Sequence, residues 1–94
     1  MGSMTKRYDD SVEVQLAAPR GSGSTIPVAF RWRGHRYTVR SLLKRWREAG
    51  EGWDRARARD DEFFRVEAEG GVYDLRLDRI EGSDRGWRLT RVWD

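Results

Sequence analysis

The fold is decided by an alternating stretch between residues 27 and 39, which reads PVAFRWRGHRYTV. Apolar side chains occupy every second position on both sides of Gly34, the pattern of two half-buried β-strands. A two-residue turn at Gly34-His35 makes Arg33 face Arg36 and joins the strands as an antiparallel hairpin. In that register the apolar side chains share one face and the arginines the other, so both faces are predicted together.

A second hairpin is predicted between Phe64 and Leu77 by the same alternation. Gly70-Gly71 would form its two-residue turn and make Glu69 face Val72. Six apolar side chains then share one face of the strand pair. They are Phe64, Val66, Ala68, Tyr73, Leu75 and Leu77.

A short helix is expected directly after the first hairpin. Ser41 can cap the N-terminus of such a helix, and Gly50 can end it. We therefore predict about two helical turns from Leu42 to Ala49. The basis is a change to helical spacing of the apolar residues, at Val39, Leu42, Leu43 and Trp46.

Two more strands complete the predicted order, one at residues 12–16 and one at Trp87–Trp93. Trp87, Leu89 and Trp93 fall on one face of the last strand, and Arg91 breaks its alternation, which indicates a β-bulge. The fold class is therefore mainly β (α+β). We predict a small antiparallel sheet or a partly open SH3-like barrel of five to six strands, with one short helix after the third strand.

The predicted core consists of large apolar side chains from the expected strands and helix. They are Phe30, Trp32, Tyr37, Val39, Leu43, Trp46, Phe64, Val66, Leu75, Leu77, Trp87 and Leu89.

Length and composition allow one folded domain. The first residues read as a cloning scar followed by a start methionine at Met4, so residues 5–94 form the expected domain, with a flexible Gly/Ser-rich loop at 17–26. Charged residues make up 37% of the chain and the mean hydropathy is −0.90, but five tryptophans indicate a packed aromatic core rather than disorder.

Several function classes are excluded or disfavoured by composition. No cysteine is present, which excludes disulfides and thiolate zinc sites. No apolar run has the length of a membrane span and no signal peptide is visible, so we expect a cytoplasmic protein with no membrane contact.

Residues that could carry catalysis or bind a cofactor are scarce. His35 is the single histidine and has no nucleophile in a recognisable pattern with it. The acidic run Asp60-Asp61-Glu62 reads as a solvated strand entrance rather than a metal site. Gly21–Ser24 lacks the lysine of a phosphate-binding loop. We therefore predict no enzyme, no catalytic residue, no metal and no cofactor.

Positive charge is concentrated in the first half of the chain. Residues 20–47 hold eight basic residues and no acid, whereas residues 48–94 hold nine basic and thirteen acidic residues. Guanidinium groups bind phosphate bidentately, so an exposed arginine face fits a polyanion. The candidate binding residues are Arg31, Arg33, Arg36, Arg40, Lys44 and Arg47, with Trp53 as a base-stacking candidate.

Two alternative roles remain open for the arginine face. Acids of the second half, such as Glu67 and Asp74, could pair with these arginines inside the molecule. Alternatively, the face could bind an acidic protein partner.

The chain also resembles a known group of proteins in four segments: residues 27–39, Trp46-Arg47-Glu48, Phe64–Glu67 and Trp87–Asp94. These segments and their tryptophans are similar to an uncharacterised family of small, mainly actinobacterial proteins. The resemblance implies genes located near error-prone translesion DNA polymerases. No activity is established for that family, so it assigns no catalytic residue.

Charge and resemblance together favour a non-enzymatic basic module. The expected function is nucleic-acid binding, with DNA contacted through its phosphates, in an accessory role in DNA repair or translesion synthesis. The alternative is an adaptor that binds a DNA polymerase or another acidic protein partner.

Overall fold

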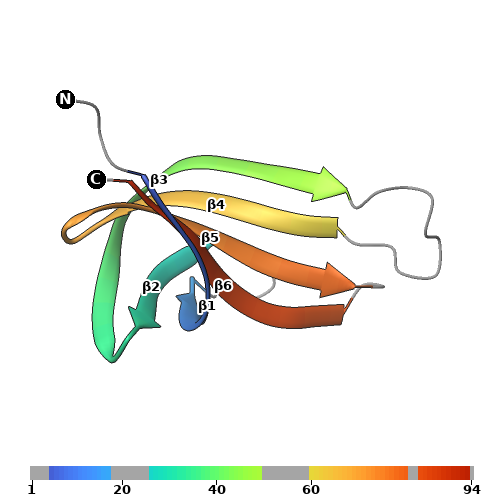
Figure 1. Cartoon of the computed structure of the whole chain (residues 1–94), viewed down its shortest axis with the longest axis horizontal. Helices are drawn as coiled ribbons and strands as arrows, with labels where there is room; N and C mark the ends of the chain where they lie inside the picture. The colour runs from blue at the N-terminus through green and yellow to red at the C-terminus, as the bar shows by residue number, and fades with distance from the viewer. Residues whose placement is uncertain (1–4, 18–25, 50–59, 81–82, 94) are drawn as a thin grey trace.

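The computed structural model describes residues 5–17, 26–49, 60–80 and 83–93, and all regular structure in these ranges is β-strand (Figure 1). None of these residues forms a helix long and apolar enough to cross a membrane. The mainly β prediction is confirmed. The strands are β1 (Lys6–Leu16), β2 (Pro27–Trp32), β3 (His35–Ala49), β4 (Asp60–Ala68), β5 (Gly71–Ile80) and β6 (Ser83–Trp93).

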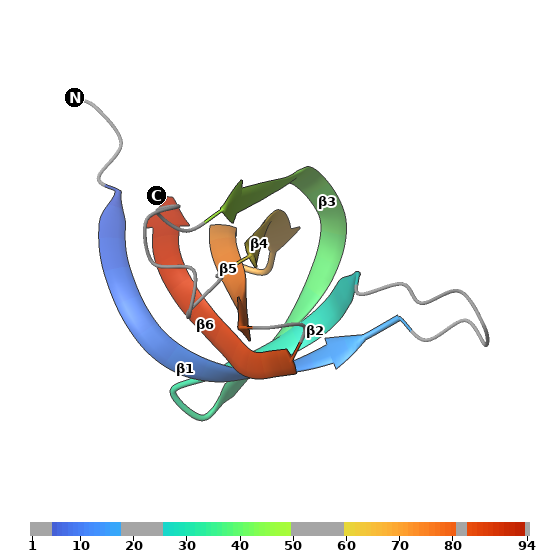
Figure 2. The same cartoon turned by 90° about the vertical axis from the view of Figure 1, so that its right-hand side faces the viewer.

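The six strands are antiparallel and close into a small barrel in chain order. Two long strands are each shared between two neighbours on different parts of the barrel. β1 pairs with β6 through its first half and with β2 through its second, and β3 pairs first with β2 and then with β4. Figure 2 shows both strands curving around the barrel. Because each of them pairs with a different neighbour in each half, they join the two parts of the sheet into one closed barrel.

The first hairpin forms, but its turn lies one residue earlier than predicted. Arg33 and Gly34 make the turn with φ of 52° and 78°, the two positive values that a type I′ turn requires. Trp32 therefore pairs with His35, and Arg31 pairs with Arg36. The sum of paired residue numbers changes by two, so the paired strand residues keep their predicted faces, whereas Arg33 becomes a turn residue.

The second hairpin differs from prediction in the same way. Its turn is Glu69-Gly70, with φ of 86° at Gly70, instead of Gly70-Gly71. Val66 pairs with Tyr73 and Phe64 with Leu75. The predicted apolar face is again confirmed, because the register has moved by an even step.

The predicted helix from Leu42 to Ala49 is wrong. These residues continue β3 and pair with β4, with register shifts between Val39 and Ser41 and between Leu42 and Lys44. Each shift inserts an extra residue into the strand and turns the following side chains to the other face. Two such interruptions in a row give the apolar residues of this strand a spacing that resembles that of a helix. They also leave Leu42 and Leu43 36% and 52% exposed.

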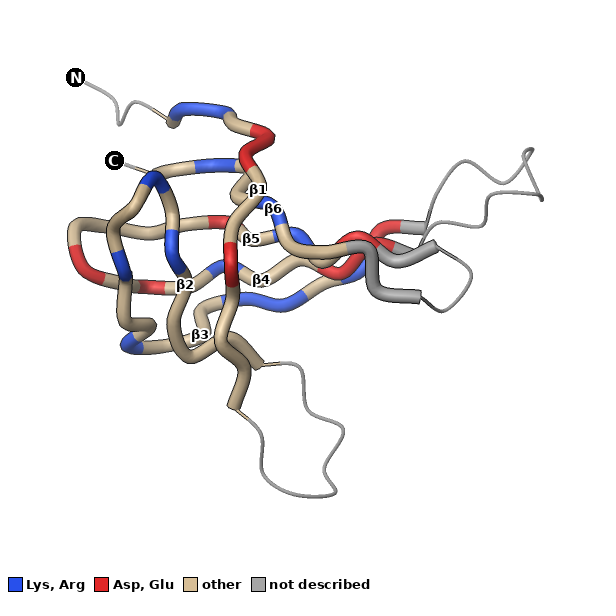
Figure 3. The backbone as a smooth tube through the Cα atoms, turned by 90° about the horizontal axis from the view of Figure 1, so that it is seen from below, with Lys and Arg blue, Asp and Glu red and all other residues tan. Residues whose placement is uncertain are grey.

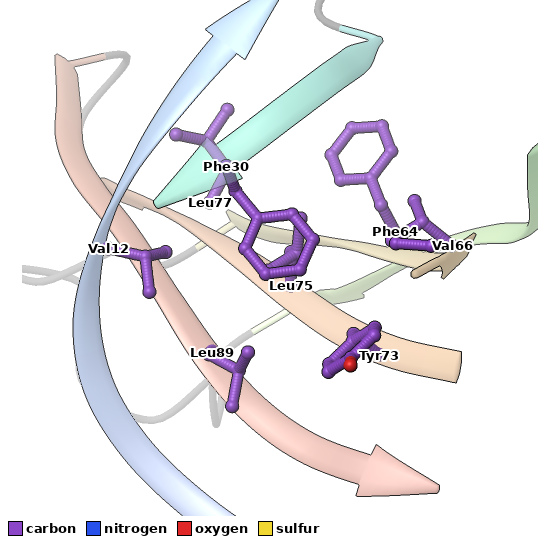
Figure 4. Close-up of a cluster of buried hydrophobic side chains, with 9 residues drawn as sticks. Val12, Phe30, Phe64, Val66, Tyr73, Leu75, Leu77 and Leu89 are labelled. Carbon is purple, nitrogen blue, oxygen red and sulfur yellow. The ribbon is translucent and has the colours of Figure 1, made fainter. Parts of the chain in front are cut away.

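The core lies inside the barrel, where side chains from five of the strands meet (Figure 4). Six predicted core residues are buried, whereas Trp32, Tyr37, Val39 and Trp87 are half-buried against them. The prediction is wrong for Leu43, which is exposed, and for Trp46, which lies outside the core cluster. The fully confirmed set is Phe30, Phe64, Val66, Leu75, Leu77 and Leu89.

The bulge predicted near Arg91 is confirmed in β6. Asp74 pairs with Arg91 while Leu75 pairs with Leu89, so Thr90 is the extra residue. The extra residue reverses the alternation, and Val92 packs on the core. The prediction that Trp93 shares the face of Leu89 is therefore wrong, because the bulge turns it to the outer surface.

Candidate nucleic-acid interface

Two of the predicted site residues come together on the outside of the first hairpin. Arg31 and Arg36 lie directly opposite each other on β2 and β3, and both are exposed. The Arg36 guanidinium donates a hydrogen bond of 3.0 Å to Gln15 on β1. Glu13 lies opposite Arg31 on β1, but no carboxylate of the described strands forms an ion pair with either arginine.

These two guanidinium groups line a cavity of about 350 Å³ on the β1–β2–β3 side of the barrel. Glu13 contributes a carboxylate, and Gln15 contributes a polar amide. The volume lies at the lower end of the range for small-ligand sites. The cavity thus offers two cationic forks beside one carboxylate and one amide.

Arg33 does not join this pair. As a turn residue it folds back over the aromatic side of the hairpin, 4.7 Å from the Trp32 ring and 5.2 Å from the Tyr8 ring. Asp10 lies 3.4 Å from its guanidinium and also accepts a 2.9 Å hydrogen bond from Trp32 Nε1. The predicted pair of Arg33 with Arg36 is therefore wrong, and Arg33 has a structural role at the mouth of the barrel.

The remaining predicted residues are distributed along β3. Arg40 and Lys44 are exposed, and the Lys44 ammonium lies 5.2 Å from the Trp46 ring. Arg47 lies opposite the inward-facing Glu62, so it belongs to the inner face of β3 rather than to the outer one. Trp53 lies outside the described residues. The predicted set is not one patch.

The internal pairing expected for Glu67 and Asp74 does not involve the predicted arginines. Glu67 accepts a 3.1 Å hydrogen bond from Ser41, and Asp74 is bound by Arg65. Figure 3 shows acidic and basic positions alternating over several strands. Several acids of the outer surface thus neutralise arginines near them in the fold. The clearest network joins Asp9 and Asp78 to Arg76 and Arg88.

The acidic run at the start of β4 does not gather ligands for a metal. Glu62 points inward, is buried and binds Arg45, whereas Asp61 lies on the other face of the strand. Within the described ranges no group of three or more His, Asp or Glu side chains is arranged to hold a metal ion.

His35 is exposed at the start of β3, 4.6 Å from the Tyr37 ring, and its Nε2 lies 4.0 Å from Glu69.

An aromatic and cationic cluster that the sequence pattern did not predict lies on the outer surface of β3, β4 and β6. The Trp46 and Phe63 rings stack with centroids 5.1 Å apart and planes 8° apart. The Arg65 guanidinium lies 5.3 Å from the Trp46 ring and 4.5 Å from the Trp93 ring. The Arg65 guanidinium therefore lies between two indole rings, one from β3 and one from β6.

The Arg65 guanidinium is held in place by Asp74 on β5. Two hydrogen bonds of 2.8 and 3.1 Å form between them. The hydrogen bond to Asp74 raises the pKa of Arg65 above its ordinary value, although burial opposes the shift. Arg65 is therefore positively charged at neutral pH.

The cluster borders a groove of about 340 Å³ that extends to the first strand. Its lining includes Arg7 of β1 and Arg91 of β6, which lie directly opposite each other. Neither forms an ion pair with a carboxylate of the described residues. After Arg31 and Arg36, this is a second cross-strand pair of arginines that forms no ion pair with the described residues, although Asp74 lies opposite Arg91 on β5.

Two signals in the sequence could have indicated the cluster. Phe63 precedes the inward Phe64, so the alternation of β4 itself assigns Phe63 to the outer face. For Trp93 the signal is the break in alternation at Arg91, because a bulge there turns the residues beyond it to the other face. For Trp46 no such signal exists, because the bulges in β3 decide its face.

Comparison with known proteins identifies a family but no activity. The chain belongs to the family described as Domain of unknown function (DUF6504), whose model matches residues 3–94. No curated protein and no solved structure matches the chain. The expected membership of an uncharacterised family is thereby confirmed.

Proposed function

We propose that this protein is a non-enzymatic nucleic-acid-binding module that contacts phosphates through Arg31 and Arg36. One observation carries the proposal: the two arginines lie opposite each other across β2 and β3, exposed and without an ion pair to any carboxylate of the described residues. Like charges in directly opposed positions destabilise a sheet. A bound polyanion would remove that repulsion.

The chemistry of the pair fits the phosphates of a polyanion. Two guanidinium forks offer bidentate hydrogen bonds, and neutralised phosphates release counterions on binding. Arg40 and Lys44 continue the exposed positive charge along β3. Few short polar side chains stand beside these cations to read base edges, so binding is expected to depend on charge and shape rather than on sequence.

The test is fluorescence anisotropy with labelled single-stranded and duplex oligonucleotides over a range of salt concentrations. The parent protein should bind more weakly as salt rises, with a linear log-log dependence. Arg31→Gln/Arg36→Gln should weaken binding and reduce the slope by about one unit for each phosphate that is no longer bound. Its thermal stability should be unchanged or slightly higher, because a repulsive pair is removed.

A matched control distinguishes the effect of losing this site from the effect of lowering the net charge. Lys6→Gln/Arg88→Gln removes the same number of positive charges, one from β1 and one from β6. Arg88 already forms an ion pair with Asp9. The control should bind nearly as well as the parent. Equal weakening by both double variants would mean that only net charge matters, and the assigned site would then be wrong.

An adaptor function is the second candidate, favoured by the free edge of β3. Residues 39–49 pair with β4 but with no other described strand, and Leu42 and Leu43 are exposed there. An acidic peptide could add to this edge as a further strand, with Arg40 and Lys44 beside it. Absence of binding to any oligonucleotide would favour this candidate.

The biological setting is proposed from the family resemblance alone. Proximity to translesion polymerase genes would place a phosphate-binding module in DNA repair, in the cytoplasm, beside DNA or beside the polymerase itself. Loss of damage-induced mutagenesis in a deletion strain, restored by the parent gene but not by Arg31→Gln/Arg36→Gln, is the expected result.

A further inference from the structure

We propose that the outer groove at Trp46 and Phe63 binds an unpaired base, so that the preferred ligand is single-stranded; this rests on the proposed nucleic-acid-binding function. The groove lies on the β3–β4–β5–β6 sheet, whereas the Arg31–Arg36 pair lies on the β1–β2–β3 sheet. It supplies what the arginine pair lacks, which is aromatic surface that accepts the face of a base.

The aromatic pair is built for stacking rather than for core packing. Trp46 and Phe63 project from opposed positions of β3 and β4 to the outer face, and both are half-buried. Their rings are nearly parallel, with planes 8° apart. Trp46 Nε1 donates a 3.1 Å hydrogen bond to Glu48, which fixes the orientation of the indole. A partly accessible ring whose orientation is fixed loses little freedom when a base stacks on it.

Two cations lie close to the Trp46 ring. Lys44 lies 5.2 Å and Arg65 5.3 Å from the Trp46 ring. Arg65 is occupied by Asp74, so its position is set before any ligand binds. Arg7 and Arg91 line the same groove without an ion-pair partner in the described ranges. A base on the rings would therefore have these two guanidinium groups in the same groove for its phosphates, while the carboxylates of Glu48 and Asp74 also line the groove.

Strand preference follows from the geometry of the ligand. In a duplex each base is stacked between its neighbours, and its faces are closed to a protein ring. In a single strand the bases can turn outward and stack on aromatic side chains, while cations follow the backbone. A groove that combines both features selects the single strand.

The experiment compares a labelled oligo(dT) single strand with a duplex of the same length at low salt. Trp46→Leu and Phe63→Leu should each weaken single-strand binding by about 5- to 150-fold, the decrease expected for one stacked base, and leave duplex binding unchanged. Trp46→Phe keeps an aromatic ring and should bind less than about fivefold more weakly than the parent. Leu43→Ala, which shortens an exposed side chain on the same strand, is the control and should bind like the parent.

Photo-crosslinking of bromouracil-substituted single strands to the parent protein provides a second measurement that needs no variant. Crosslinks should map to Trp46 or Phe63. Crosslinks confined to the β2–β3 hairpin, or parent-like single-strand binding by folded Trp46→Leu, would overturn this assignment while leaving the phosphate-binding function intact. Failure of the parent to bind any oligonucleotide would overturn both proposals.

Discussion

Replacing Arg65 by Met is expected to destabilise the barrel strongly, because it leaves the Asp74 carboxylate buried without its partner. The Asp74 side chain is 4% exposed, and that of Arg65 is 27% exposed. Two charge-assisted hydrogen bonds join them at 2.8 and 3.1 Å. Methionine preserves much of the apolar stem of arginine, so the change mainly removes the charge and its hydrogen bonds.

The magnitude follows from burial and from the aromatic contacts. Removing one partner of a buried ion pair lowers the free energy of unfolding by about 3 to 5 kcal/mol. The guanidinium also contacts Trp93 at 4.5 Å, which is worth about 0.5 to 1 kcal/mol at a partly exposed site. Since 1 kcal/mol moves the Tm of a domain this small by about 4 to 8 °C, the Tm should fall by at least about 12 °C.

The assay is urea and thermal unfolding followed by circular dichroism, arranged as a double-mutant cycle. Arg65→Met/Asp74→Leu should be more stable than Arg65→Met, because no charge is then buried alone. Arg91→Met is the matched control: it removes a guanidinium from the same surface, where it has no ion pair among the described residues, and should cost less than about 1 kcal/mol. An Arg65→Met Tm within a few degrees of the parent would refute the role of this pair.

Three further predictions concern the core and the first turn. Phe64→Ala should lower the free energy of unfolding by about 3 to 5 kcal/mol, because the ring is fully buried; a decrease below about 2 kcal/mol in urea titration would mean that the cavity collapses. Gly34→Ala should cost about 1 to 2 kcal/mol through backbone strain at φ 78°, since an added Cβ meets no atom within 4 Å; equal stability by thermal melting would contradict the turn assignment. Trp32→Ala should cost about 3 to 5 kcal/mol because its ring no longer packs on the core, and a melt within a few degrees of the parent would show that the hairpin faces are reversed.

The faces of both hairpins were predictable from the sequence because successive side chains of a strand point to opposite faces. The face of a residue therefore depends only on whether its number is odd or even within the strand. Arg31 separates Phe30 from Trp32, and Arg65 separates Phe64 from Val66. One face of each strand is therefore buried, whichever residues form the turn. The turns themselves lie one residue earlier than the sequence pattern predicts. The pattern assigns glycine to the first turn position, whereas Gly34 and Gly70 occupy the second, where a positive φ is needed.

The course of β3 was not predictable from local pattern. Val39, Leu42, Leu43 and Trp46 have helical spacing, and a short isolated segment carries no other sign of its state. Pairing with β4 satisfies the backbone of residues 39–49 in a strand, and two register shifts adjust the strand to the curvature of the barrel. Tertiary pairing therefore overrides the local preference.

By itself the sequence determined the β class, the two hairpins with their apolar faces, the bulge near Arg91 and the excess of arginine in the first half. The tertiary structure alone decided which arginines meet. Arg31 faces Arg36 because the turn begins at Arg33, and Arg7 faces Arg91 because closure of the barrel joins β1 to β6, the first and last strands. It also turned Trp46 and Trp93 outward, since bulges reverse the faces of the residues beyond them. The physical reason is that alternation specifies a face only within an unbroken strand, whereas pairing between distant strands depends on the whole barrel.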